Sequence, residues 1–237
     1  MTTHLFALEF GANEPLVVAR FWSGFLGREL VDEPDGGHLL PPGEDDPGFR
    51  LRFVPAPEPK PGPNYGHFDL TSDSLVDQQE KVARALALGG RHLDIGQLPD
   101  EEHVVLADPE DNEFCVIEPG NKFLAGCGFI GALSSDGTQR VGYFWSAALG
   151  WPLVWDQDEE TAIQAPGGGP KISWGGPPVL PKTGRSRPTF DLVADGDLAA
   201  EVERLVSLGA TRIGAGPAGS VELADPDGNE FRVALPR

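Results

Sequence analysis

The sequence contains few cysteines, few basic residues and no long hydrophobic run. Cys115 and Cys127 are its only cysteines, too few for a disulfide framework, and their spacing matches no zinc motif. No apolar stretch approaches the roughly 18 residues of a membrane helix, and the N-terminal residues lack the basic and apolar regions of a signal peptide. We therefore expect a soluble, cytoplasmic protein that contacts no membrane.

The shortage of basic residues gives the chain a strongly acidic balance. Its 18 Lys and Arg stand against 37 Asp and Glu, for a formal net charge of −19. Because this charge repels the phosphates of nucleic acids, we expect no nucleic-acid partner. The hydrophobic share of 40% is that of a globular protein.

What the sequence has in abundance is internal repetition. The phrase LADPEDNEF at residues 106–114 returns as LADPDGNEF at residues 223–231, and FWSGFLGREL at residues 21–30 returns as FWSAALGWPL at residues 144–153. The tripeptide FDL also occurs twice, beginning at Phe68 and Phe190. These pairs indicate two copies of a unit of about 120 residues. We predict domains at residues 1–119 and 124–237.

Each copy contains two similar smaller units. A stretch with helical apolar spacing precedes each of four Leu-Gly pairs, in which the glycine is a natural helix stop. A short strand precedes each stretch, at residues 4–10, 67–71, 129–133 and 189–193, and up to three short runs follow it. The sequence therefore predicts an α+β fold of four strand-helix-three-strand units. The glycines of the four stops are Gly27, Gly89, Gly150 and Gly209.

The repeated phrase has the chemistry of a hairpin turn. Asp and Pro begin the turn, and its fourth position, Asp111 or Gly228, tolerates a positive φ. In the strand that follows, Glu113 and Cys115 share one face, and Phe114 lies on the other. The phrase is structural, and only this strand bears on chemistry.

The unit order, the repeated turn and the run YGHFDLTSD at residues 65–73 together resemble the vicinal oxygen chelate superfamily, the group of glyoxalases, bleomycin-resistance proteins and extradiol dioxygenases. The resemblance covers essentially the whole chain as two tandem glyoxalase-like domains. It implies curved mixed sheets with helices on their outer faces, and four units that pair within the chain as single-domain relatives pair in dimers. Because one fold carries many reactions, the resemblance does not fix the chemistry.

In metal-dependent members of this superfamily, the inner face of the sheet holds one divalent ion that binds two substrate oxygens. The ligands are a His on the first strand, a His on the strand that opens the second unit, a Glu on the last strand and often a fourth group from the first unit. His67 matches the second position. Cys115 and Arg232 stand where the Glu is expected.

The other positions match the metal pattern less well. On the first strand, alternation groups His4 with Phe6 toward the helices and puts Glu9 on the other face. The first unit offers only Arg50 and Arg52, and the second copy has Thr189 in place of His67. Two alternatives stay open: no cofactor, or one divalent ion (Ni, Zn, Fe or Mn) in the first domain.

The remaining candidates follow from their expected faces. Asp69 and Glu113 share the face of His67 and are the candidate catalytic groups, with His67 as the candidate metal ligand. Trp22 and Trp145 are expected in the core, and Asp191 is expected to form a buried ion pair with Arg232. The expected ligand-binding residues are Trp151, Trp155, Trp174, Phe53, Glu9, Cys115 and Arg232.

Two functions are compatible with this pattern. The first is a protein that binds a small organic molecule in a sheet-lined cleft without the complete metal site. The alternative is a metal-dependent lyase, isomerase or dioxygenase with its site in the first domain. In either case we expect a small-molecule ligand, and a monomer with an internal pseudo-dimer or a homodimer.

Overall fold

The computed structural model describes residues 3–34, 36–41, 48–56, 58–98 and 100–236, and it contains the four predicted units in order. Each unit is a strand, a helix and three further strands. The first has β1 (Thr3–Ala12), α1 (Pro15–Leu26), β2 (Leu30–Glu33), β3 (Gly36–Leu39) and β4 (Leu51–Pro55). The second has β5 (Gly66–Leu70), α2 (Leu75–Ala87), β6 (Arg91–His92), β7 (Val104–Ala107) and β8 (Glu113–Val116).

The third and fourth units repeat this order. The third has β9 (Ile130–Ser135), α3 (Gln139–Leu149), β10 (Leu153–Gln157), β11 (Glu160–Gln164) and β12 (Lys171–Trp174). The fourth has β13 (Pro188–Ala194), α4 (Leu198–Leu208), β14 (Thr211–Ala215), a short 3-10 helix (Pro217–Gly219), β15 (Val221–Ala224) and β16 (Glu230–Ala234). The predicted α+β class and unit order are confirmed.

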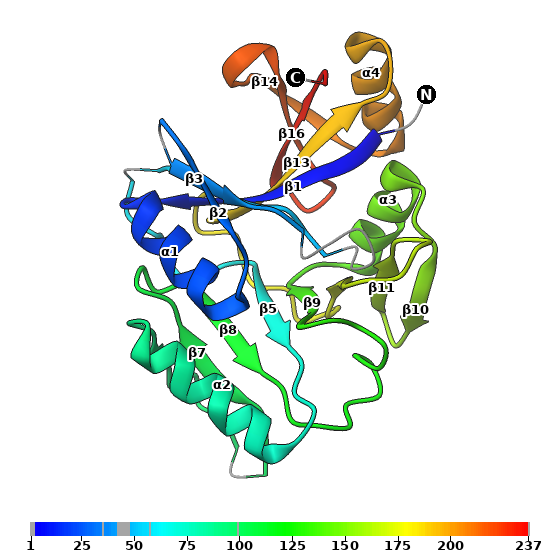
Figure 1. Cartoon of the computed structure of the whole chain (residues 1–237). Helices are drawn as coiled ribbons and strands as arrows, with labels where there is room; N and C mark the ends of the chain where they lie inside the picture. Colours follow the sequence, from blue (N-terminus) through cyan, green and yellow to red (C-terminus); the bar gives the residue numbers. More distant parts are fainter. Residues whose placement is uncertain (1–2, 35, 42–47, 57, 99, 237) are drawn as a thin grey trace.

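The units pair across the two halves of the sequence to form two eight-stranded sheets (Figure 1). The first and fourth units form the terminal sheet, in the order β14-β15-β16-β13-β1-β4-β3-β2. The second and third units form the central sheet, in the order β10-β11-β12-β9-β5-β8-β7-β6. Antiparallel pairing of β1 with β13 and of β5 with β9 joins the halves. This is the pairing within one chain that the resemblance implied.

The hydrophobic core lies on the helix-bearing faces of the sheets. In the first half, Trp22 of α1 packs edge-on against Phe68 of β5 and Phe114 of β8. In the second half, Trp145 packs edge-on against Phe231 and at a tilt against Phe190. Both tryptophans are 1% exposed, which confirms their predicted core positions. Each half therefore has its own group of packed aromatic rings within one shared hydrophobic core, and each sheet needs both halves.

The helix ends follow the sequence signals. Gly27 and Gly150 end α1 and α3 in the left-handed conformation, with φ of 67° and 69°. Ser74 and Asp197 cap α2 and α4 with their own side chains. The N-termini of α1 and α3 have no such cap, and the repeated hairpins supply one, as described below.

Strand β1 departs from the predicted alternation. Its register against β13 shifts between Leu5 and Ala7, so the two ends of the strand do not follow one face pattern. Leu8 is buried in the core, but His4 is exposed and binds Asp195, and the ring of Phe6 lies under the guanidinium of Arg50. The expectation that His4 and Phe6 face the helices is therefore wrong.

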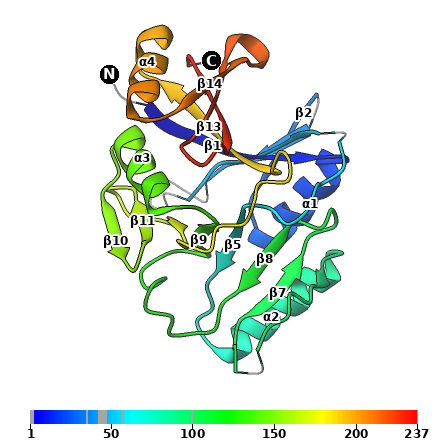
Figure 2. The same cartoon turned by 180° about the vertical axis from the view of Figure 1, so that it is seen from behind.

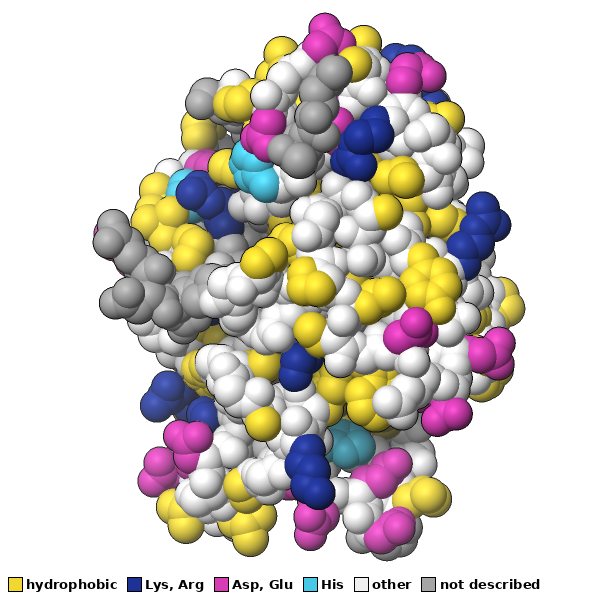
Figure 3. Space-filling view, turned by 90° about the vertical axis from the view of Figure 1, so that its right-hand side faces the viewer, with side chains coloured by type: hydrophobic (Ala, Val, Ile, Leu, Met, Phe, Trp, Pro, Cys, Tyr) yellow, Lys and Arg dark blue, Asp and Glu magenta, His cyan; other side chains and the backbone are white. Residues whose placement is uncertain are grey.

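No helix of the described chain is long and apolar enough to span a bilayer. On the side of the molecule seen in Figure 3, hydrophobic side chains form small separate groups among polar ones.

Candidate functional site

A cavity of about 800 Å³ lies on the helix-free face of the central sheet. This volume suits a small organic molecule, since ligand pockets commonly span about 300–1,000 Å³. Its walls come from both halves of the chain. The lining residues that matter below are His67, Glu113, Cys115, Phe123, Ser134, Asp136, Trp155, Glu160, Ser173 and Trp174.

Four adjacent strands build the polar floor of this cavity. His67 on β5 lies opposite Ser134 on β9, and Ser134 in turn lies opposite Ser173 on β12. Asp69, two residues after His67, lies beside Cys115 on β8. Because alternate residues of a strand share a face, all five side chains point to the same side of the sheet.

The floor is one connected polar cluster. Ser134 Oγ donates to Asp69 Oδ2 at 2.5 Å, and Ser173 Oγ lies 3.3 Å from Ser134 Oγ. His67 Nε2 lies 3.4 Å from Asp69 Oδ1. Each of His67, Asp69 and Cys115 offers one possible ligand atom, and these three atoms lie within 4.8 Å of one another. They are close enough to share a metal ion. The sequence prediction that His67 and Asp69 share a face with Cys115 is confirmed.

The electrostatics of the cluster favour a charged imidazole and a neutral thiol. Burial lowers the pKa of His67, but hydrogen bonds with Asp69 and Cys115 and the negative charge of Asp69 outweigh it and raise the pKa to about 10. Burial raises the pKa of the Cys115 thiol, and the neighbouring His67 offsets this only in part. The His67 side chain is 39% exposed, so the imidazole is also available to a ligand.

Aromatic side chains form part of the cavity wall. Trp155 of β10 and Phe123 of the connection between the two halves pack edge to face, with their ring centroids 6.4 Å apart. Trp155 is 38% exposed, whereas Trp174 is almost fully buried and also belongs to the core. Two of the tryptophans proposed from sequence thus line this cavity, and Phe123 is an aromatic residue that sequence reasoning missed.

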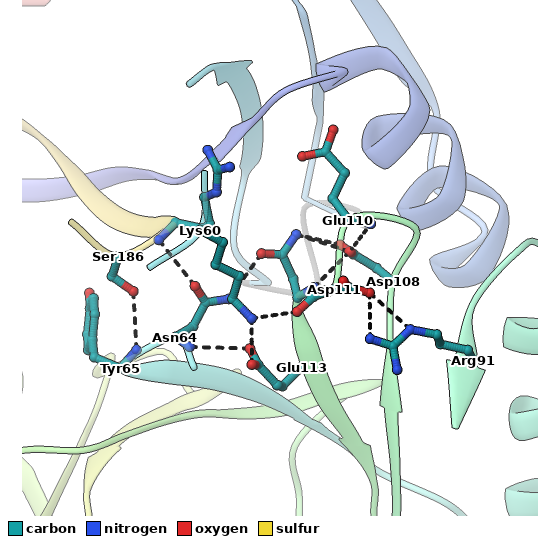
Figure 4. Close-up of polar contacts among 11 residues, drawn as sticks. Lys60, Asn64, Tyr65, Arg91, Asp108, Glu110, Asp111, Glu113 and Ser186 are labelled. Carbon is teal, nitrogen blue, oxygen red and sulfur yellow. Dashed lines mark hydrogen bonds and ion pairs between the residues drawn. The ribbon is translucent and has the colours of Figure 1, made fainter. Parts of the chain in front are cut away.

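Glu113 lines the cavity, but a lysine holds its carboxylate (Figure 4). Lys60 Nζ lies 2.5 Å from Glu113 Oε1 and donates to the backbone oxygen of Asp111. The backbone N–H of Asn64 donates to Glu113 Oε2 at 3.3 Å. Glu113 is also outside the group that could hold a metal. The structure therefore does not join Glu113 to His67 and Asp69 as an acid–base trio.

The corresponding face of the terminal sheet has a smaller cavity of about 470 Å³, with Glu9 and Arg232 among its lining residues. Charged side chains fill its floor. Arg52 lies 3.3 Å from Glu9 and 3.2 Å from Asp191, and Arg232 pairs with Glu9. Buried ion pairs are present, but the predicted pairing of Asp191 with Arg232 is wrong, because the first unit supplies the partner of each residue.

Two aromatic candidates lie elsewhere. Phe53 is 1% exposed and stacks on Phe10 in the core, so its expected position in a cleft is wrong. Trp151 lines a separate cavity of about 220 Å³ near His4 and Arg50. The strand face explains the position of Phe53, because it alternates with Arg52, which points to the helix-free side.

Sequence reasoning missed Ser134 and Ser173 for two reasons. It placed the partners of His67 in the first unit, at His4, Arg50 and Arg52, whereas the sheet of His67 contains the third unit. It also ended the opening strand of the third unit at residue 133, whereas β9 continues to Ser135. The expected pseudo-dimer pairing was the signal that could have identified both serines.

The comparisons agree with this architecture. The family model described as a glyoxalase-like domain matches residues 7–117 and 132–234, one match in each half of the sequence. The chain belongs to the glyoxalase-like domain family. The repeated units of this glyoxalase-like protein are thus the family's tandem domains, in agreement with the resemblance to the vicinal oxygen chelate superfamily.

Solved structures share the fold at low sequence identity. Glyoxalase I from Zea mays is 15% identical, with a TM-score of 0.68 over 99% of this chain and 92% of that chain. A putative dioxygenase from Bacillus subtilis is also 15% identical, with a TM-score of 0.59 over 99% of this chain and 85% of that one. No curated protein matches the sequence. At these identities the likeness establishes the fold and leaves the reaction open.

Proposed function

We propose that this glyoxalase-like protein binds a small organic molecule in the cavity of the central sheet. The observation that carries the proposal is a cavity of about 800 Å³ that joins aromatic walls to a hydrogen-bonding floor. Trp155 and Phe123 would contact the apolar part of the ligand, and His67 would donate a hydrogen bond to one of its oxygen atoms. Such a division between apolar walls and a few polar groups is typical of ligand sites.

The floor residues support binding without the usual metal. By the resemblance described above, metal-dependent members have a His at the position of His67, a Glu at that of Cys115 and further ligands from the first unit. In the central sheet, the strands that pair with β5 and its neighbour carry Ser134 and Ser173 instead. Only His67 keeps the expected residue type. In the terminal sheet, the equivalent strands carry Thr189, Arg232, Glu9 and Arg52, whose ion pairs leave no ligand set for a cation.

The binding proposal is tested with a fragment set in saturation-transfer NMR, followed by calorimetry on the hits. Trp155→Ala removes an exposed wall and should weaken binding roughly tenfold, the scale of a truncated aromatic contact. Leu153→Ala is the matched control, because Leu153 is on the same strand, is similarly exposed and lies outside the cavity. Equal losses in both variants, or hits unaffected by Trp155→Ala, would place the ligand elsewhere.

A second candidate is a metal-dependent lyase, isomerase or dioxygenase, and the close approach of His67, Asp69 and Cys115 favours it. Imidazole, carboxylate and thiolate donors suit zinc, and three protein ligands leave a position open for substrate. A bound ion would supply Lewis acidity toward the ligand oxygens. The chain itself would orient Asp69 through the hydroxyl of Ser134.

Metal content separates the two candidates. Protein without a His-tag, purified without chelator, is analysed for Ni, Zn, Fe and Mn, before and after addition of each metal. Stoichiometric metal that is lost in His67→Ala, but kept in His103→Ala, would establish the metal-dependent candidate. His103 is a suitable control because it lines the same cavity outside the cluster. No retained metal in any preparation would eliminate that candidate.

A further inference from the structure

Acidic side chains outnumber lysines and arginines among the described residues that line the central cavity. None of the described lining residues is a lysine or an arginine, but three are acidic: Glu113, Asp136 and Glu160. The smaller cavity of the terminal sheet differs, because three arginines and three glutamates line it. The central cavity is therefore the one with an acidic character.

Two of the three carboxylates have no cationic partner among the described residues. Glu113 is balanced by Lys60, and Asp69 on the floor lies 3.4 Å from His67 Nε2. Asp136 accepts a backbone hydrogen bond from Leu180 at 2.7 Å, which leaves its charge uncompensated. Glu160 is exposed at the start of β11, and the ion pairs of the described chain include neither residue.

The basic side chain of Lys171 lies beside the aromatic wall of the cavity. Lys171 on β12 donates to the backbone oxygen of Phe123, and its ammonium lies 4.7 Å from the centre of the Phe123 ring. It therefore stabilises the aromatic wall and is not among the residues that line the cavity. An anionic ligand would meet no lysine or arginine among the described lining residues, but it would meet the unpaired carboxylates of Asp136 and Glu160.

From these observations we propose that the central cavity selects a neutral or cationic aromatic molecule and rejects anions. The inference rests on the proposed binding function and names the class of ligand. The rings of Trp155 and Phe123 offer stacking and cation–π contacts, and the carboxylates of Asp136 and Glu160 attract a positive charge. The net charge of −19 adds a long-range repulsion of anions.

The test uses three probes with one scaffold: 2-naphthylmethylammonium, 2-naphthylmethanol and 2-naphthoate. Calorimetry on the full chain should give the tightest binding for the ammonium and the weakest for the carboxylate. Because a carboxylate about 6 Å from a charge acts through solvent, we expect roughly a threefold effect from each of Asp136 and Glu160 at moderate salt. The difference between the charged probes should shrink as salt is added.

Variants of the cavity test whether its charge, and not its shape, determines which probe binds more tightly. The double variant Asp136→Asn/Glu160→Gln should weaken binding of the ammonium about tenfold and leave the alcohol unchanged. Asp156→Asn is the matched control, because Asp156 is an exposed carboxylate of β10 outside the cavity. Equal or tighter binding of the carboxylate, or a double variant with unchanged discrimination, would overturn the ligand class.

The experiments distinguish a wrong ligand class from a wrong proposed function. If none of the three probes binds while other fragments do, the aromatic class is wrong and the binding function stands. If the wider fragment set also gives no Trp155-dependent binding, the proposed function itself is wrong.

Discussion

At the scale of single residues, the repeated Asp-Pro turn is a joint between units. Asp108 accepts a hydrogen bond from Trp22 Nε1 at 3.1 Å, and it also accepts the backbone N–H groups of Glu110 and Asn112. Asp225 does the same for Trp145 Nε1, at 3.3 Å, in the second half. The first aspartate of the phrase thus ties each hairpin to the helix of the preceding unit.

The next acidic residue of the phrase caps that same helix. The Glu110 carboxylate accepts the backbone N–H groups of Asn13 and Glu14 at the start of α1. Asp227 accepts the backbone N–H and the hydroxyl of Thr138 at the start of α3. Because helix N-termini carry free N–H groups and a partial positive charge, an acidic side chain from another element stabilises them.

We expect Asp108→Ala to lower the free energy of unfolding by about 3 kcal/mol, since it leaves the buried Trp22 and backbone donors without an acceptor. Asp225→Ala should cost a similar amount, because its bonds repeat those of Asp108. Urea denaturation followed by tryptophan fluorescence measures both. Asp100→Ala, at an exposed position, is the control and should change stability by less than about 0.5 kcal/mol. An Asp108→Ala protein as stable as this control would contradict the role of the joint.

At the scale of elements, two segments that cross between the sheets hold the cavities in shape. We call residues 58–65 the first strap and residues 175–187 the second strap; Figure 2 shows the second strap, in yellow, crossing from the central sheet to the terminal sheet. The backbone N–H of Tyr65 donates to Ser186 Oγ at 3.2 Å, and that of Arg187 donates to Asn64 Oδ1 at 3.2 Å. These reciprocal bonds relate the straps by an approximate twofold symmetry.

Each strap also has one lysine that anchors it to a repeated hairpin. Lys60 pairs with Glu113 at 2.5 Å, and Lys182 pairs with Glu230 at 2.6 Å. Each lysine donates in addition to a backbone oxygen of the turn, that of Asp111 or Gly228. The glutamate of the repeated phrase is therefore a structural anchor, although its strand face made it a candidate for catalysis.

We expect Lys60→Met to lower the free energy of unfolding by about 1–3 kcal/mol, because it leaves the mostly buried Glu113 carboxylate without its partner. Replacing both residues, in Lys60→Met/Glu113→Met, should cost less than Lys60→Met alone, since no unpaired charge remains. Thermal and urea denaturation of the two single variants and the double variant complete the cycle. A double variant at least as unstable as the sum of the single variants would show that the pair does not act as a unit.

At the scale of the whole molecule, aromatic groups and sheets divide the chain differently. Each half of the sequence has its own group of packed aromatic rings, but β1 and β5 of the first half pair with β13 and β9 of the second. Separated halves would expose these strands as unpaired edges, which associate readily. The functional cavity also needs both halves, because β5 and β8 supply His67 and Cys115 while β9 and β10 supply Ser134 and Trp155.

We therefore expect residues 1–119 and 120–237, produced together as separate chains, to purify as a one-to-one complex with the circular dichroism of the intact protein. Produced alone, the first fragment should self-associate through β1 and β5, as symmetric dimers do. Size-exclusion chromatography with light scattering measures both states. A stable, folded monomer of residues 1–119 would contradict this expectation.

The sequence by itself determined the elements and the fold. The Leu-Gly stops, the alternation of short strands and the two copies of the turn are local signals, and local chemistry fixes helix ends and turns. Asp111 and Gly228 have the positive φ, 64° and 88°, that their place in the turn predicted. The same local reasoning correctly placed His67, Asp69 and Cys115 on one face, because alternation along a strand needs no knowledge of its neighbours.

Only the tertiary structure decided which residues meet across strands. Ser134 reaches Asp69, Ser173 reaches Ser134, and Glu9 reaches Arg52 and Arg232, through pairing between units that lie far apart in the chain. Lys60 of the first strap neutralises Glu113 of β8, and no spacing in the sequence reveals this contact. Such contacts depend on sheet order and register, and these are set by the packing of whole units. The phrase LADPEDNEF is thus readable as a turn from its letters, but only the fold makes it a joint, a helix cap and an anchor.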